Sequence, residues 1–271
     1  MKTVLIIAVV LMLLYLWLIM PRMWNKPDIE PFQGVLYAHR GLHDNETEAP
    51  ENSIAAFQKA VEAGFGIELD IQLTKDKIPV VFHDFTLDRV CGVKGSLSEF
   101  TYKELQQFSL AKSRERIPRF EDVLRLIDGK VPLIVEFKGV TPDIGLCPVA
   151  DEILRNYKGV YCMESFNPLM VAWYRKEHRD VLRGQLSEKF FKNGNRTFQY
   201  FALQHLLMNF LARPDFIAYD WNGHNELSRV LCCKLFKATA VAWTIKSNEE
   251  LQKMKKHFEL FIFDSFVPEQ K

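Results

Sequence analysis

The chain has 271 residues, and its 35 Lys and Arg against 34 Asp and Glu give a formal net charge of +1. This length suits a single α/β barrel of about 250 residues. The charge balance excludes a strongly basic protein and gives no reason to expect a nucleic-acid partner. The five cysteines are scattered without paired CxxC spacing, which argues against a disulfide framework and against a cysteine zinc or redox site.

An uncharged apolar run covers residues 4–20. A helix over this run would be roughly 26 Å long, close to the hydrocarbon thickness of a bilayer. A secretory signal peptide is the alternative, but the small residues of a cleavage site do not follow, because Pro21-Arg22-Met23-Trp24 is bulky and basic. We therefore expect an uncleaved transmembrane anchor over residues 1–25 and a single-pass location in the cell membrane. Lys2 with the amino terminus balances Arg22 with Lys26, so the positive-inside rule leaves the side of the membrane open.

From residue 31 to residue 271, short apolar runs alternate with helix-like segments, as in repeated βα units. Helices are predicted at 53–63, 120–127 and 149–156. Strands are predicted at 35–39, 131–137, 159–165, 182–186, 216–220, 239–244 and 260–263, with 66–72 and 79–83 as two pieces of the second strand. The stretch 84–118 reads as an excursion after that strand. About eight strands in one chain of this length predict a (β/α)8 TIM barrel rather than an open sheet.

Two carboxylates stand on one face of the predicted second strand. In Ile67-Glu68-Leu69-Asp70 the side chains of Glu68 and Asp70 point one way, because a strand alternates its faces. Like charges this close resist burial unless something neutralises them, and a bound divalent cation would do so. An edge strand that turns this face to water is the competing interpretation.

Polar residues also end the other predicted strands of the first half. His39 and Arg40 stand at the end of the first predicted strand, and His83 stands at the end of the second. Glu136 and Lys138 stand at the end of the third, which is predicted at 131–137. In a TIM barrel the catalytic residues lie at the carboxyl ends of the strands. The barrel interpretation therefore predicts one site that contains them all.

Five motifs stand in order along the chain: Ala38-His39-Arg40-Gly41, Ala49-Pro50-Glu51-Asn52-Ser53, Glu68-Leu69-Asp70, His83-Asp84-Phe85-Thr86-Leu87-Asp88-Arg89 and Glu136-Phe137-Lys138. In order and spacing they resemble the glycerophosphodiester phosphodiesterase family. A weaker similarity continues through Glu164-Ser165-Phe166 and Trp243-Thr244. Lys246 stands where the family commonly has Asn, and residues 263–268 are a loose version of its terminal Thr-Asp-x-Pro, which puts substrate contacts in doubt.

The resemblance implies a metal-dependent hydrolase that cleaves glycerophosphodiesters into glycerol 3-phosphate and an alcohol. By position, Glu68, Asp70 and Glu136 would be the metal ligands, and His39 and His83 the acid/base pair. Three carboxylates supply hard oxygen ligands, which suit one divalent cation, Mg²⁺ or Ca²⁺. The sequence leaves open which histidine is the acid, and whether water or the substrate's own glycerol hydroxyl attacks phosphorus.

Four further residues complete the predicted site. Arg40 joins the catalytic set as a fixed cation for the phosphate, and Lys138 is expected to contact the phosphate rather than only to pair with Glu136. Trp243 would form an aromatic wall for the glycerol, with plain core packing as the alternative. Glu51 is placed among the substrate-binding residues, while capping of a helix that begins near Asn52 and support of the metal stay open.

Two alternative functions remain at this stage. A lysophospholipase D would use the same site on lysophospholipids at the membrane. A catalytically silent barrel that binds a phosphorylated ligand is the other, although it would be free to lose some of the site residues. Residues 198–211 are predicted as an amphipathic barrel helix, with contact to the lipid interface as the alternative. The oligomeric state stays open.

Overall fold

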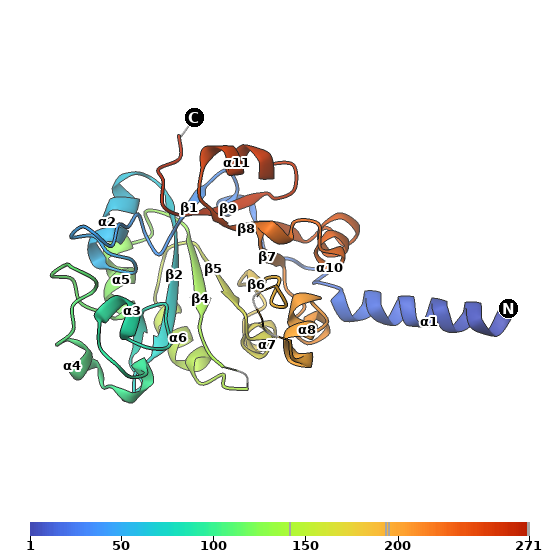
Figure 1. Cartoon of the computed structure of the whole chain (residues 1–271), viewed down its shortest axis with the longest axis horizontal. Helices are drawn as coiled ribbons and strands as arrows, with labels where there is room; N and C mark the ends of the chain where they lie inside the picture. The colour runs from blue at the N-terminus through green and yellow to red at the C-terminus, as the bar shows by residue number, and fades with distance from the viewer. Residues whose placement is uncertain (141, 193, 195, 270–271) are drawn as a thin grey trace.

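The computed structural model describes residues 1–140, 142–192, 194 and 196–269. Within these residues, eight parallel strands close into a barrel (Figure 1). In chain order they are β1 Leu36–His39, β2 Gly66–Leu73, β4 Leu133–Phe137, β5 Tyr161–Ser165, β6 Arg183–Ser187, β7 Phe216–Asp220, β8 Thr239–Ile245 and β9 Leu260–Phe263. β1 pairs with β9 on one side and with β2 on the other, which closes the barrel and confirms the predicted fold.

The helices lie outside the barrel (Figure 1). They are α2 Ile54–Glu62, α5 Phe120–Ile127, α6 Leu146–Leu154, α7 Pro168–Glu177, α8 Phe198–Gln204, α9 Asn209–Ala212, α10 Leu227–Val230 and α11 Asn248–Met254. Short turns of helix at η1 Glu30–Phe32, η3 Trp221–Gly223 and η4 Leu231–Leu235 complete the connections. In α5 the buried residues are Phe120, Val123, Leu124 and Ile127, the spacing of a helix with one face in the core.

The barrel interior has an apolar lower level and a polar upper level. Residues two apart on a strand point to the same face. A strand with one side chain in the barrel interior therefore places the side chain two positions later in the interior as well, nearer to the carboxyl end of the strand. The lower level includes the buried Tyr37, Ile134, Cys162 and Val241, which belong to one apolar cluster. Two positions further along the same strands stand His39, Glu136, Glu164 and Trp243. The fold therefore gathers the polar side chains at the carboxyl ends of the strands.

The excursion after β2 begins with a short hairpin. The run predicted at 79–83 as a piece of the second strand is a separate strand, β3 Pro79–Val81, which pairs antiparallel with β2. The excursion continues through α3 Asp88–Cys91, η2 Leu97–Glu99 and α4 Tyr102–Leu105. It has its own apolar cluster around Phe82, Leu87 and Leu105. This packing fixes the loop that carries His83.

The predicted single helix over residues 198–211 is wrong, because the chain forms the two short helices α8 and α9. Leu206 between them has a left-handed φ of 55°, which ends a right-handed helix. Leu203 and Leu206 are buried, whereas Phe198 is 82% exposed and Phe201 is 38% exposed. The apolar residues of this stretch therefore divide between the core and the surface.

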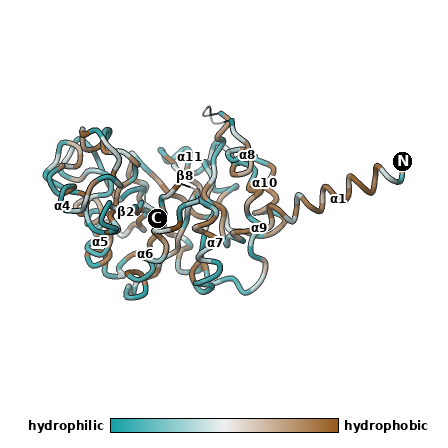
Figure 2. The backbone as a smooth tube through the Cα atoms, turned by 90° about the horizontal axis from the view of Figure 1, so that it is seen from below, coloured by the Kyte–Doolittle hydropathy of each residue, from teal (hydrophilic) through white to brown (hydrophobic). Residues whose placement is uncertain are grey.

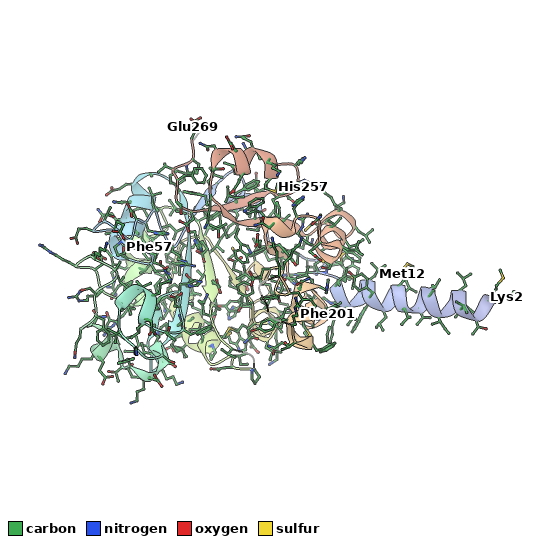
Figure 3. All side chains as sticks on the ribbon, in the orientation of Figure 1. Lys2, Met12, Phe57, Phe201, His257 and Glu269 are labelled. Carbon is green, nitrogen blue, oxygen red and sulfur yellow. The ribbon has the colours of Figure 1, made fainter. Side chains whose placement is uncertain are left out.

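Helix α1, Lys2–Ile19, projects from one end of the barrel, beside α8, α9 and α10 (Figures 1 and 2). It is hydrophobic along almost its whole length, as the brown tube in Figure 2 shows. Among the described residues it is the one helix long and apolar enough to cross a membrane. The side chains of Lys2 and Met12 stand clear of the barrel in Figure 3, whereas Ile19 is fully buried against it.

Candidate active site

Three buried carboxylates form the centre of the site. Glu68 and Asp70 share the inner face of β2, and Glu136 on β4 is the register partner of Asp70. One oxygen from each of the three lies within 4.8 Å of the others. The strand register, which depends on the pairing of β2 with β4, therefore brings together carboxylates that are 66 positions apart. Such a group of hard oxygen donors can hold a divalent cation.

The charges of this group are only partly balanced by the protein. Burial, reinforced by the charges of Asp70 and Glu136, raises the pKa of Glu68 well above its usual value. Lys138 Nζ lies 3.3 Å from Asp70 Oδ1 and 3.1 Å from Glu136 Oε1. Burial opposes ionisation of Asp70, but the charges of Lys138, His83 and Arg40 together outweigh it and lower the pKa of that carboxyl. Lys138 and the guanidinium of Arg40, which lies 3.6 Å from Asp70 Oδ2, are two positive charges beside three carboxylates, which leaves negative charge that favours a cation.

Arg40 links the end of β1 to this group. Its left-handed φ of 57° turns its backbone N–H toward Glu68 Oε2, at 3.1 Å. Its guanidinium lies 3.6 Å from Asp70 Oδ2 and donates to Glu51 Oε1 at 2.7 Å. Asn52, which follows in the same loop, donates to Asp70 Oδ2 at 2.9 Å. The loop after β1 therefore orients both carboxylates of β2.

Glu51 lies behind Arg40 and does not cap a helix. Its oxygens also accept hydrogen bonds from Arg89, at 2.6 and 2.7 Å, and from Asn45, at 2.9 Å. Burial opposes its ionisation, but the hydrogen bonds from Arg89 and the charge of Arg40 lower the pKa of Glu51 to about 2. The cap of α2 is Ser53, whose hydroxyl accepts from the backbone of Ala56 at 3.1 Å.

His39 ends β1 next to the carboxylates. Its Nδ1 lies 2.9 Å from Asp264 Oδ2, and its Nε2 lies 4.0 Å from Glu68 Oε2. His43 Nε2 lies 3.3 Å from the other oxygen of Asp264. Burial, together with the charge of Arg40, lowers the pKa of His39 to about 4, although Asp264 opposes the shift. Asp264 thereby fixes the orientation of the His39 ring.

His83 stands in the loop after β3 and has an aspartate partner of its own. Its Nδ1 lies 2.6 Å from Asp84 Oδ1, and Asp84 accepts from Arg89 Nε at 2.6 Å. Gln72 on β2 donates to the backbone carbonyls of Phe82 and His83, at 2.8 and 3.1 Å. These bonds tie the histidine loop to the strand that carries the carboxylates.

Four partners in the site were missing from the sequence-based prediction: Asn52, Asp84, Asp264 and Glu164. Glu164 on β5 is the register partner of Glu136 and is buried. Among the described residues its Oε2 has no hydrogen-bond partner, and burial raises the pKa of its carboxyl well above the usual value. A carboxylate at the end of an apolar strand was the available signal for Glu164. Asp84 is the sequence neighbour of His83, whereas Asp264 meets His39 only in the assembled barrel.

A pocket of about 260 Å³ opens beside Glu136 and Lys138. Its far walls are largely aromatic and apolar, with Phe166 and Phe190 from the strand ends and Tyr200 and Leu203 from α8. Trp243 packs edge to face on Phe166, with ring centres 5.7 Å apart. In the described part of the chain, its buried Nε1–H has no hydrogen-bond partner. Trp243 does not line this pocket itself, but it contacts the Phe166 side chain that does.

The geometry agrees with the comparisons to known proteins. Residues 39–257 match the Glycerophosphoryl diester phosphodiesterase family. The chain is 32% identical over 235 residues to the Bacillus subtilis protein named "Putative glycerophosphodiester phosphodiesterase YhdW", covering 81% of this chain and 89% of that protein. It is 28% identical to human Glycerophosphodiester phosphodiesterase 1, covering 85% of this chain and 77% of the human protein.

Solved structures share the fold. An Oleispira antarctica phosphodiesterase in complex with the product sn-glycerol-3-phosphate matches with a TM-score of 0.70 and 21% identity, covering 86% of this chain and 93% of that one. The Thermotoga maritima glycerophosphodiester phosphodiesterase matches with a TM-score of 0.65 and 22% identity, covering 84% and 94%. The chain therefore belongs to the glycerophosphoryl diester phosphodiesterase family and is an enzyme of the activity that gives the family its name.

Proposed function

We propose that this enzyme hydrolyses glycerophosphodiesters to glycerol 3-phosphate and an alcohol by histidine acid/base catalysis at a divalent cation site. One observation carries the proposal: three buried carboxylates within 4.8 Å of one another stand beside a histidine on the neighbouring strand. Proton transfer and a cation that offsets charge on the phosphoryl oxygens both accelerate cleavage of a phosphodiester near neutral pH.

Glu68, Asp70 and Glu136 would hold the cation. Their oxygens suit Mg²⁺ or Ca²⁺, and no soft ligand stands among the three. The pKa of Glu68 is raised because the carboxyl group is buried beside other carboxylates with too little positive charge near it. When bound, the cation would supply a charge that offsets the one growing on the phosphoryl oxygens.

His39 and His83 would exchange protons with the substrate. Each is oriented through Nδ1, by Asp264 at 2.9 Å and by Asp84 at 2.6 Å respectively. An Nδ1–H that donates to a carboxylate leaves Nε2 as the atom that accepts or delivers a proton. One histidine would take a proton from the nucleophile and the other would give a proton to the leaving alkoxide.

The remaining site residues would bind and position the substrate. Arg40 and Lys138 bring positive charge to the phosphate, Arg40 with a fork suited to two phosphate oxygens. Trp243 would use its free Nε1–H on a glycerol hydroxyl. Glu51 would act through Arg40 and Arg89, since both of its oxygens accept hydrogen bonds from them.

The N-terminal helix would anchor the enzyme in the cell membrane. Residues 1–25 form the proposed anchor and residues 31–271 the catalytic barrel. The support is the length and hydropathy of α1 and its exposure over most of its length. The alternative of a cleaved signal sequence requires removal of a helix whose last turn is built into the barrel, where Asn209 Nδ2 donates to the Ile19 carbonyl at 2.8 Å.

Turnover of glycerophosphocholine by the purified full chain tests the proposal. We expect release of glycerol 3-phosphate, loss of turnover in EDTA, and recovery when Mg²⁺ or Ca²⁺ is added in excess. A metal-free chain with undiminished turnover would exclude the cation site. A chain that cleaves no glycerophosphodiester with either metal would exclude the proposed reaction.

A further inference from the structure

A second pocket, of about 470 Å³, lies at the point where α1 joins the barrel. One wall is residues 20–25, which follow α1 directly. The other walls carry arginines that come from different elements: Arg175 and Arg179 from α7 and the residues after it, Arg183 from β6, and Arg213 from the end of α9. Arg22 adds a fifth from the linker. The catalytic mechanism uses none of them.

The backbone holds several of these guanidinium groups in place. Arg213 donates to the carbonyls of Trp17 and Met20, at 3.1 and 2.7 Å. Arg175 donates to the carbonyls of Phe210 and Leu211, at 3.1 and 2.7 Å. These bonds leave other N–H groups of both side chains for a ligand, because a guanidinium has five donors. Backbone carbonyls therefore fix Arg175 and Arg213 in the pocket, and Arg183 is buried beside them.

The pocket carries more positive charge than the nearby carboxylates neutralise. Asp215 is the carboxylate beneath it, at 3.5 Å from both Arg22 and Arg183, and no carboxylate appears among the described lining residues. Within the described ranges, the side chain of Arg179 makes no hydrogen bond or ion pair. Burial lowers the pKa of Arg183 to about 10; the charge of Asp215 opposes that shift, and the neighbouring arginines add to it. An anion would relieve this repulsion.

The length of α1 places the pocket at the surface of a bilayer. Residues 2–14 are exposed and form a helix of roughly 20 Å, shorter than a hydrocarbon core of about 30 Å. The last turn of α1 packs against the barrel, where Trp17 lies 5.2 Å from the Phe210 ring. If α1 spans the membrane, the barrel face around this turn must therefore reach the bilayer boundary. The arginines would then stand at the depth of the lipid phosphates.

We propose that the arginine pocket at the base of α1 binds the phosphate of an anionic phospholipid head group. Guanidinium groups bind phosphate oxygens in pairs of parallel hydrogen bonds, and basic pockets beside transmembrane helices suit such head groups. The inference rests on the proposed membrane anchor, since without the bilayer the pocket would meet only free anions. Lipid binding here would fix how the barrel sits on the membrane.

The test uses the full chain in nanodiscs of phosphatidylcholine, with or without a minority of phosphatidylglycerol. Bound lipid is counted by native mass spectrometry after release from the disc. We expect one retained phosphatidylglycerol, with affinity reduced by about tenfold or more in the double variant Arg175→Gln/Arg179→Gln. The matched control is Lys253→Gln/Lys256→Gln, which removes the same charge from two exposed positions, one on α11 and one in the turn that follows it. Because Arg175 also bonds the backbone, Arg179→Gln alone is the second variant, and turnover of glycerophosphocholine reports folding of every variant.

Each outcome bears on the proposal. Retention that falls in the arginine variants and not in the lysine control supports it. Equal loss in both sets would mean general charge attraction and would overturn it. In a separate arm, the chain in detergent receives either inorganic phosphate or phosphatidylglycerol, and thermal unfolding is measured. Equal stabilisation by the two would mean a free-anion site and would also overturn the proposal. A chain that does not enter the nanodiscs at all would contradict the anchor, whereas insertion without lipid preference would contradict only the pocket.

Discussion

Glu136 on β4 and Glu164 on β5 are register partners, so two buried carboxylates lie at the same level of the barrel interior. They differ in their surroundings. Glu136 has Lys138 Nζ at 3.1 Å, whereas the Oε2 of Glu164 has no partner among the described residues. We therefore treat Glu136 as one of the three proposed cation ligands and Glu164 as a neighbour of that group.

We predict that Glu164→Gln changes cation binding much less than Glu68→Gln does. Glu164 lies outside the group of three carboxylates whose oxygens come within 4.8 Å of one another, so its replacement by an amide removes none of the grouped ligands. Glu68→Gln removes one of the three grouped ligands and should lower the affinity for Mg²⁺ and Ca²⁺ by about tenfold or more. Titration calorimetry of the two variants measures both values. Equal losses would make Glu164 a fourth ligand.

The histidine variants should separate chemistry from metal binding. We expect His39→Ala and His83→Ala each to lower kcat by about 10² to 10⁴, the usual worth of a positioned acid or base. Their cation affinity should stay close to that of the unchanged chain, because neither histidine belongs to the carboxylate group. His257→Ala, outside the site, is the control. Loss of metal from either histidine variant as large as from Glu68→Gln would contradict this division of roles.

Local patterns in the sequence predicted the part of the site that lies on single strands. Alternation along β2 placed Glu68 and Asp70 on one face, and strand ends marked His39 and Glu136. The sequence could not predict the partner of His39, because Asp264 is 225 positions away and meets it only when β9 closes the barrel on β1.

Other features depend on tertiary contacts that no local pattern encodes. The run 198–211 has the periodicity of one helix, but the left-handed turn at Leu206 divides it so that α9 can pack against α1 and α7. The arginine pocket joins segments near residues 22, 179 and 213, which the sequence keeps far apart. Register between strands, such as that of Glu136 with Glu164, likewise appears only in the assembled sheet.

Glu51 should make stability depend on acid. Its pKa of about 2 lies below the ordinary value of 4.5, so the ionised form stabilises the fold by about 3 kcal/mol at neutral pH. A carboxyl with a lowered folded-state pKa stabilises the fold fully above about pH 4.5, and this contribution is lost as the pH falls toward 2.

We therefore predict that Glu51→Gln lowers the thermal midpoint by several degrees at pH 7 and by progressively less between pH 4.5 and pH 3. The measurement is thermal unfolding of both chains in detergent across this range. Glu121→Gln, which breaks the exposed pair with Arg125 on α5, should change the midpoint little at any pH, since exposed pairs contribute little. A difference between Glu51→Gln and the unchanged chain that stays constant with pH would show that the carboxylate charge is not what stabilises the loop.

Trp243→Phe should weaken substrate binding without slowing the chemical step. Phenylalanine keeps a ring against Phe166, whose centre lies 5.7 Å from that of Trp243. It removes the Nε1–H, which has no partner among the described residues and which we propose to bind a glycerol hydroxyl. One lost hydrogen bond is worth about 1 kcal/mol, so KM for glycerophosphocholine should rise about fivefold while kcat changes little. Trp173→Phe on α7, outside the pocket, is the matched control and should leave both constants unchanged. A fall in kcat at constant KM would instead place the indole among the groups that act in the transition state, and an unchanged KM with unchanged kcat would return Trp243 to a packing role.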